Sequence, residues 1–348
     1  MSTENNLPDP EVGFSHLWGQ HGIGTKWGIE VSQSFDWPGV YGSRKKEIRL
    51  NESALTSLHQ SNVLDAMLEI KSAMIDIIHG HKLVELHTSS VRRIDSLTKV
   101  YKRGYELGEI SLLDINKLKI ERLSAVRRMN EAATTLSDAI YRLSQLSSSA
   151  DCSYVIERLK EYPLTPIQPL ATYTSQLHRL DPMLAYNRKM SQAMQQKATT
   201  ARRSNLPGFS LGYSHEYEMG ERFNGFSVSL TLPVFSGRGK VRAAQDMQES
   251  YSADYDRIYS ERDSELKATW HKAMLLSNEI EGYAKALDDD NNIRLLDKAF
   301  QSGHITLMEY FLELNYFIDA QAQYLDLQYS YQLCMARLNR FSSITTDE

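Results

Sequence analysis

The sequence is poor in cysteine and has no long apolar run, and each shortage excludes a class of protein. The 348 residues include two cysteines, Cys152 and Cys334, whose spacing matches no metal or redox motif. We interpret both as structural. No run of about 18 apolar residues occurs, and we therefore expect no transmembrane helix.

Signatures of catalysis and of nucleic-acid binding are also missing. The net charge is −5, and we find no Lys/Arg cluster and no RNA-binding aromatic motif, so no nucleic-acid partner is expected. There is no phosphate-binding loop, nucleophile elbow or pair of catalytic carboxylates, and His215-Glu216 lacks the second histidine of a zinc protease motif. We predict a protein that is not an enzyme and needs no cofactor or metal.

The first eight residues are polar and cannot form a secretory signal, which taken alone indicates a cytoplasmic protein. The composition, with 24% charged and 41% hydrophobic residues, is that of a folded chain. Its length allows one to three domains.

A repeated motif organises the chain. Its first copy is Tyr105–Asp114 and its second is Phe300–Glu309. In both, an aromatic residue stands three positions before a glycine, an isoleucine two after it, a hydroxyl residue next and a carboxylate six after it. Each copy lies between two long helical patterns, so we predict two helical hairpins whose tips are these motifs. The glycine allows the turn, and Ser111 or Thr306 caps the returning helix.

Two pairs of alternating segments predict strands. The first pair covers 13–18 and 27–37, and the second lies within 206–238. Eleven residues is about the length that crosses a bilayer when tilted, and aromatic residues at the ends suit its two interfaces. The aromatic residues that we assign to membrane strands are Trp18, Trp27, Phe35, Trp37 and Phe226.

Long helices connect these strands to the tips. We predict helices over about 43–105, 112–146, 240–300 and 307–341, and an ascending helix over about 172–205, in which Asp181-Pro182 is a start signal for the stretch 181–203. The helix over 307–341 has a heptad seam rich in Tyr, Gln and Leu, which favours packing against neighbouring helices around a wet interior. The predicted segments are 1–41 (strand pair), 42–147 (hairpin), 148–174 (connector), 175–205 (ascending helix), 206–238 (strand pair), 239–342 (hairpin) and 343–348 (tail).

The duplication predicts an assembly. Four membrane-length strands cannot close a barrel, whereas three copies supply twelve. We therefore expect a homotrimer, mainly α-helical with a small β part. The first half lacks the ascending helix that precedes the second strand pair, so we infer that a signal sequence and a helix of about 30 residues precede residue 1 in the natural protein.

These features resemble the TolC-like outer-membrane efflux family, including its heavy-metal-efflux branch. The resemblance rests on the tips at 107–111 and 302–306 and on the strand-to-helix exits at 38–44 and 233–238, and it covers nearly the whole chain. It implies a trimeric channel with a twelve-stranded β-barrel in the outer membrane of a Gram-negative cell and an α-barrel across the periplasm. It further implies a passive exit duct that works with a periplasmic adaptor protein and an inner-membrane pump.

The resemblance also suggests roles for the tip residues. Glu309 matches a ring of acidic residues at the periplasmic narrowing, with Asp114 and Glu313 as further candidates; first-turn carboxylates favoured by the helix dipole are the alternative. Tyr105 and Phe300 are candidates for holding the hairpins closed, against simple core packing. Adaptor contacts, as opposed to turn chemistry alone, are assigned to Leu107, Gly108, Ile110, Ser111, Gly303, His304, Ile305 and Thr306.

Three alternatives stay open at this stage. The histidines His79, His81 and His87 invite a metal site, but residues two apart on a helix do not face one another, so we favour a solvated face. A periplasmic adaptor also has a helical hairpin, although it requires a lipoyl-like domain and one hairpin. A soluble coiled-coil scaffold fits the polar N-terminus and leaves the strand pairs unexplained.

Overall fold

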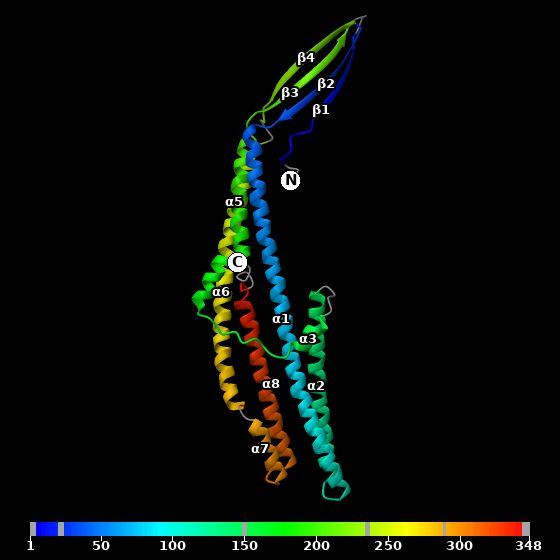
Figure 1. Cartoon of the computed structure of the whole chain (residues 1–348), viewed down its shortest axis with the longest axis vertical. Coiled ribbons are helices and arrows are strands. Elements are labelled where there is room, and N and C mark those ends of the chain that lie inside the picture. Colours follow the sequence, from blue (N-terminus) through cyan, green and yellow to red (C-terminus); the bar gives the residue numbers. More distant parts are fainter. Residues whose placement is uncertain (1–4, 20–23, 148–151, 234–236, 288–289, 343–348) are drawn as a thin grey trace. The chain divides into compact units, whose positions relative to one another are not determined.

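The computed structural model describes residues 5–19, 24–147, 152–233, 237–287 and 290–342, and these form long helices and one four-stranded sheet (Figure 1). The predicted fold class, mainly α with a small β part, is confirmed. The chain divides into two compact units. The sheet unit comprises residues 1–61 and 181–261, and the tip unit comprises residues 62–180 and 262–348. Among the described helices, none combines the length and apolarity needed to cross a bilayer.

The sheet is antiparallel, and its strands lie in chain order. They are β1 (Glu11–Trp18), β2 (Thr25–Phe35), β3 (Gly208–Glu218) and β4 (Glu221–Thr231). The central pair, β2 with β3, joins the two predicted strand pairs directly, from Phe35 opposite Phe209 to Lys26 opposite Glu218. Both predicted strand pairs are therefore parts of one sheet.

The two faces of this sheet differ sharply in polarity. Residues directly opposite one another on paired strands share a face, and Val31 lies opposite Val12 on β1 and Tyr213 on β3. Tyr213 in turn lies opposite Phe226. The same face carries Phe14, Ile29, Phe35, Phe209, Leu211, Val228 and Leu230, and its polar members include His16, Gln33, His215, Asn224 and Arg222. The other face carries Gly13, Ser15, Gly28, Glu30, Ser32, Ser34, Ser210, Gly212, Ser214, Gly225, Ser227 and Ser229.

The strands of the first pair each begin two residues earlier than predicted, at Glu11 and Thr25, and the second ends two residues earlier. β2 ends at Phe35 and α1 (Pro38–Glu106) begins three residues later, so Trp37 lies in the link and not in a membrane strand. Proline is favoured in the first turn of a helix, where its missing N–H costs nothing. The helix therefore starts at Pro38, five residues before the predicted start. Part of the second predicted exit, residues 234–236, lies outside the described residues.

One predicted helix has the observed bounds, and the ascending helix is divided. Helix α2 spans Leu112–Leu146 as predicted. The connector contains α3 (Ser153–Arg158), and the ascending helix is split into α4 (Leu170–Leu180) and α5 (Pro182–Arg203). Pro182 cannot donate a backbone hydrogen bond, and the Asp181 side chain instead accepts from the N–H groups of Met183 and Leu184. The helix predicted over 240–300 contains α6 (Lys240–Leu287) and α7 (Asp290–Gln301), with residues 288–289 outside the described residues, and α8 spans Leu307–Leu338.

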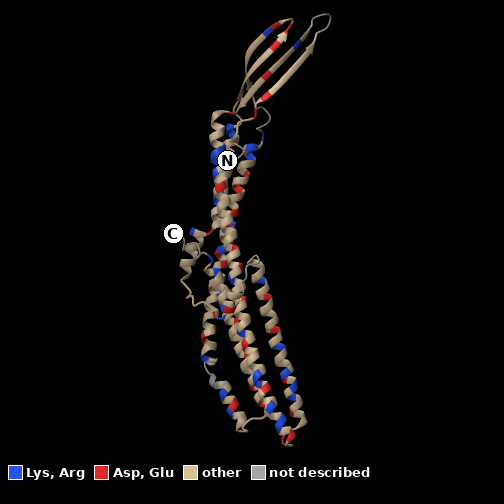
Figure 2. Ribbon diagram, turned by 45° about the vertical axis from the view of Figure 1, so that its right-hand side comes forward, with Lys and Arg blue, Asp and Glu red and all other residues tan. Residues whose placement is uncertain are grey.

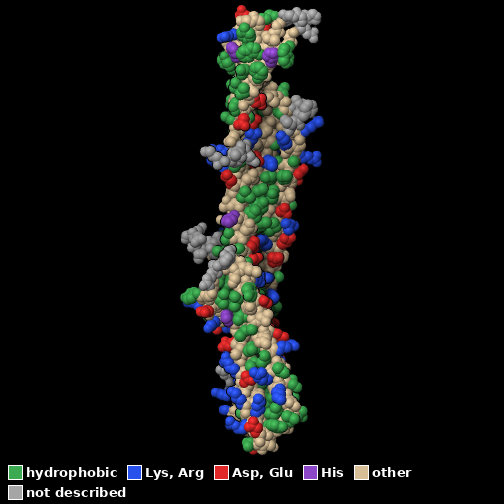
Figure 3. Space-filling view, turned by 90° about the vertical axis from the view of Figure 1, so that its right-hand side faces the viewer, with side chains coloured by type: hydrophobic (Ala, Val, Ile, Leu, Met, Phe, Trp, Pro, Cys, Tyr) green, Lys and Arg blue, Asp and Glu red, His purple; other side chains and the backbone are tan. Residues whose placement is uncertain are grey.

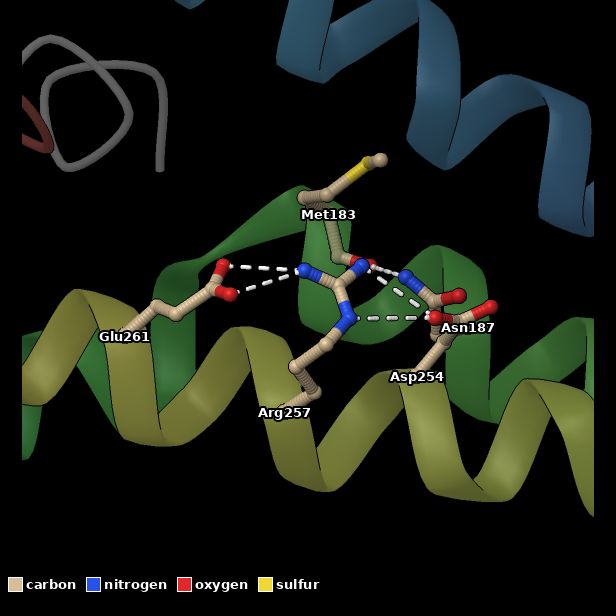
Figure 4. Close-up of polar contacts among 5 residues, drawn as sticks. All are labelled: Met183, Asn187, Asp254, Arg257 and Glu261. Atoms are coloured by element: carbon tan, nitrogen blue, oxygen red, sulfur yellow. Dashed lines mark hydrogen bonds and ion pairs between the residues drawn. The ribbon is translucent and has the colours of Figure 1, made fainter.

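Small polar residues let the helices of the sheet unit pack closely. Lys189 on α5 donates to Ser57 Oγ (2.8 Å) and to the carbonyl of Ser53 (3.3 Å) on α1, beside the fully buried Ala54. On α6, Arg257 lies between Asp254 and Glu261, one helical turn to either side, and binds both carboxylates at 2.9–3.3 Å (Figure 4). These contacts fix neighbouring side chains near the surface, where each ion pair contributes little to stability.

The tip unit is held together by a core that draws on both hairpins. Its buried members come from α1, α2, α7 and α8 and include Leu118 and Leu314. Polar side chains also join the hairpins, because Asp297 on α7 accepts from Arg93 on α1 (2.5 Å) and from the hydroxyl of Tyr310 on α8 (2.7 Å). Tyr310 is 1% exposed, and its burial, together with the bond to Asp297, raises the pKa of its hydroxyl.

Replacing Tyr310 with phenylalanine tests this contact. The variant keeps the ring in the core but leaves Asp297 Oδ1 without that donor, so the free energy of unfolding should fall by about 1–3 kcal/mol. Urea denaturation followed by circular dichroism measures the change. Tyr316→Phe is the control, because Tyr316 lies on the same helix with 68% of its surface exposed. Equal losses in the two variants would contradict the role of the Tyr310 hydroxyl.

Candidate functional site

The two repeated motifs are hairpin tips with the same backbone geometry. At the end of α1, the N–H of Gly108 donates to the carbonyl of Tyr105 (3.0 Å) and the N–H of Glu109 to that of Gly104 (2.9 Å). At the end of α7, Gly303 and His304 make the equivalent bonds to Phe300 (3.0 Å) and Ala299 (2.9 Å). This pair of bonds is the Schellman motif. Gly108 and Gly303 have φ values of 80° and 74°, which is why glycine is required at both.

The returning helices begin with the predicted caps. The Ser111 hydroxyl accepts from the N–H of Asp114 (3.2 Å), and the Thr306 hydroxyl accepts from the N–H of Glu309 (3.3 Å). At the second tip the carboxylate of Glu309 also accepts from the N–H of Thr306 (2.7 Å), which completes a capping box. The predicted role of these hydroxyl residues as N-caps is confirmed.

Both candidate acidic residues take part in these caps. Hydrogen bonds from the backbone and then the side chain of Thr306 hold the pKa of Glu309 below its usual value. Asp114 accepts from the Ser111 hydroxyl (2.7 Å) and pairs with Lys117 (3.5 Å). Glu313, one turn further along α8, is exposed. Capping thus accounts for the position of both first-turn carboxylates within one chain, whatever they do in an assembly.

The tip residues differ in how accessible they are. Gly108, Ser111, Gly303, His304 and Thr306 are exposed, and Leu107 is 68% exposed. Ile305, in contrast, packs against the core of the tip unit. Ile110 folds back over the end of α1, where a Cβ on Gly104 would lie 2.6 Å from Ile110 Cγ1. The two isoleucines therefore anchor the tips, while the leucine and the polar residues face outward.

A groove of about 520 Å³ lies between the two tips. Its walls come from the ends of α1 and α7 and from both turns. The lining residues include Val100, Tyr101, Leu107, Glu109, Phe300 and Thr306. This groove has an apolar floor with polar groups at its rim, and it is accessible in the single chain.

Within the chain, the aromatic residue that joins the two hairpins at the first tip is Tyr101. Tyr105 is 45% exposed, whereas Tyr101, one turn earlier, stacks on Phe300 at a ring distance of 6.1 Å. Phe300 also packs against Tyr310 at 4.7 Å, so core packing describes its role. Tyr101, Gly104 and Asp297 were not predicted as site residues; the only sequence signal for them is the spacing of aromatic residues before the glycine.

The histidines of α1 contradict the predicted solvated face. His79 is buried, lies 3.2 Å from Asp326 and stacks on Tyr329 of α8 at 4.5 Å. Burial lowers the pKa of His79, although the charges of Asp326 and Asp76 oppose this shift. His81 and His87 are partly buried. A Cβ on the intervening Gly80 would lie 3.0 Å from the Leu136 backbone, so α1 and α2 pack closely here. Within the described residues, no group of three metal-binding side chains gathers.

No protein-family profile and no curated protein sequence matches this chain. Solved structures do match it. A membrane protein from Pseudomonas aeruginosa has a TM-score of 0.75 at 14% identity, with 96% of this chain and 83% of that one covered. The outer membrane channel CmeC of Campylobacter jejuni has a TM-score of 0.73 at 14% identity, covering 95% and 76%. The outer membrane protein VceC of Vibrio cholerae has a TM-score of 0.73 at 14% identity, covering 96% and 85%.

The similarity extends over both repeats, because almost the whole of this chain is matched in each case. It agrees with the two tips, the four strands and the long helices described above. The chain therefore has the fold of outer-membrane channel proteins, as the resemblance to the TolC-like efflux family predicts.

Proposed function

We propose that this chain is the subunit of an outer-membrane channel, a passive exit duct of a tripartite efflux pump. The sheet is the observation that carries the proposal. Three of its strands have 11 residues, which is long enough for a tilted strand to cross a bilayer. One face is apolar and the other is lined with Ser and Gly, which suits lipid on one side and a water-filled lumen on the other.

Barrel closure supports a trimer. In the four-stranded sheet, β1 and β4 each pair on one side, so both edges have free backbone groups. Such groups cannot remain unpaired in lipid. Three copies related by a threefold axis close a twelve-stranded barrel by joining β4 of one copy to β1 of the next. The partners in the membrane are then two further copies and outer-membrane lipid.

The tips are the proposed contact with a periplasmic adaptor protein, which couples the duct to an inner-membrane pump. The groove between the tips offers Leu107 and Val100 as apolar contacts and Glu109 and Thr306 as polar ones. The rival identities fit less well, because an adaptor has one hairpin where this chain has two, and a soluble scaffold has no need of a sheet with one apolar face.

Arginine substitutions on the two faces of β4 test the membrane assignment. Val228 is 75% exposed on the apolar face, and arginine there should cost about 2–4 kcal/mol in lipid and abolish single-channel conductance in planar bilayers. Ser227, its neighbour on the polar face, lies 3.1 Å from Glu30, with which an arginine can pair. Ser227→Arg should therefore still insert and conduct. Similar behaviour of both variants would contradict a lipid-facing sheet.

The acidic ring makes a separate prediction. Glutamine can replace glutamate in a capping box, so Glu309→Gln removes the charge and keeps the cap. If three copies of Glu309 surround the narrowing, the cation preference in single-channel recordings should fall several-fold, because the ring repels anions. Glu281→Gln, which removes an exposed carboxylate from α6, is the control. Unchanged selectivity in Glu309→Gln would show that Glu309 does not line the lumen.

The adaptor contact is tested at an exposed tip residue. Gly303 and Ile305 are unsuitable, because one needs a positive φ and the other is anchored in the core. Leu107→Glu places a charge in the groove without disturbing either feature and should reduce efflux at least tenfold while trimers persist on native gels. Leu275→Glu, at an exposed leucine of α6, should leave efflux intact. Full efflux by Leu107→Glu would exclude the groove as the docking site.

A further inference from the structure

Positive charge gathers where the helices of the sheet unit meet the sheet. Three segments, 44–49, 197–203 and 238–242, contain ten Lys and Arg residues and a single carboxylate, although the whole chain has a net charge of −5. We call these ten residues the basic collar. They are Arg44, Lys45, Lys46, Arg49, Lys197, Arg202, Arg203, Arg238, Lys240 and Arg242. The expectation of no Lys/Arg cluster is therefore wrong for the folded chain.

The fold brings the three segments together. Arg203, at the end of α5, donates to the carbonyl of Gly39 (3.1 Å) and to Ser43 Oγ (2.6 Å) in the first turns of α1. Figure 2 shows Lys and Arg on the helix ends that adjoin the sheet. Nine of the ten side chains are exposed. Arg44 is half-buried and pairs with Asp36 at 2.8 Å, so the negative charge of this neighbouring carboxylate is neutralised.

Part of the collar surrounds a groove between three helices. The groove has a volume of about 600 Å³ and is lined by Arg44 on α1, Lys197 on α5 and Lys240 on α6. The lining also includes the carboxylate of Glu47 and the apolar side chains of Ile48, Ala244 and Met247. Three cations outnumber the one carboxylate, and with the apolar side chains beside them they suit an anionic group that is attached to a hydrocarbon chain.

The collar also lies next to the end of the apolar sheet face. Phe35 and Phe209 stack at 5.2 Å at that end, and Trp37 in the adjoining link is exposed. Figure 3 shows hydrophobic side chains over the sheet and Lys and Arg at the helix ends below it. Aromatic residues followed by cations mark the level of lipid headgroups. The strands themselves carry more acidic than basic residues, so the excess of positive charge is confined to the helix ends beside the sheet.

We propose that the basic collar binds the phosphate headgroups of anionic phospholipids at the membrane surface from which the helices emerge. The groove lined by Arg44, Lys197 and Lys240 holds one such headgroup, with the start of an acyl chain over Met247. This inference rests on the proposed function, which places the sheet in the membrane. It adds a lipid-binding site that fixes the depth of the sheet in the bilayer.

Lipid retention tests the site with the full chain. The protein is incubated in non-ionic detergent micelles containing equal amounts of phosphatidylglycerol and phosphatidylcholine, repurified, and its bound lipids are quantified by mass spectrometry. The wild-type chain should retain phosphatidylglycerol preferentially, and added salt should weaken this preference. Each lysine near an anionic lipid surface contributes about fivefold in affinity. The double variant Lys197→Gln/Lys240→Gln should therefore lower the preference by up to about 25-fold.

The matched control is Lys272→Gln/Lys285→Gln, which removes two exposed lysines from α6 outside the collar. An equal loss of preference in this control, or none in the collar variant, would overturn the proposal. At equal ionic strength, inorganic phosphate should displace no more lipid than sodium chloride does. Greater displacement by phosphate would show that the site binds free phosphate and would also overturn the proposal. Circular dichroism verifies that both variants keep the wild-type helix content.

The conductance experiment separates this proposal from the channel assignment. A chain that conducts ions but retains both lipids equally refutes the collar and leaves the channel in place. A chain that retains phosphatidylglycerol through Lys197 and Lys240 but never conducts refutes the channel and supports the headgroup site.

Discussion

Two long helices must each reverse direction within a few residues, and the hydrogen bonds at these reversals determine where everything near the tips lies. A helix leaves its last carbonyl groups without partners, and the Schellman bonds at Gly108 and Gly303 satisfy them. The caps at Ser111 and Thr306 do the same for the first N–H groups of α2 and α8. Because these hydrogen bonds fix where α8 begins, the side chain of Tyr310 faces the core and its hydroxyl reaches Asp297.

Much of this arrangement could be predicted from local patterns. The spacing of apolar residues gave the bounds of α2, and alternation located β2 and β4, because both signals repeat within a single element. The tip geometry was also predictable, since a left-handed residue followed by a cap needs glycine and then a hydroxyl side chain. The role of Tyr101 was missed because the distance from the glycine does not reveal how far the neighbouring hairpin extends.

Features assembled from distant segments escaped prediction. His79 was assigned to a solvated face because its partners, Asp326 and Tyr329, lie on a helix more than two hundred residues later. The collar was overlooked for the same reason, because each of its three segments is short and only the fold places them at one end of the sheet. The start of α5 was predictable, in contrast, because Asp181 and Pro182 form a local cap-and-proline signal that needs no distant partner.

The pairing of β2 with β3 has a consequence for how the chain folds. These strands meet with Phe35 opposite Phe209, so the centre of the sheet closes a loop that contains the whole first hairpin and its connector. Contacts of such separation form slowly, and an isolated two-stranded hairpin is marginally stable. During synthesis the edge of β2 that pairs with β3 therefore stays unpaired until the second repeat has been made. The yield of folded protein depends on keeping this edge from pairing with other strands during that interval.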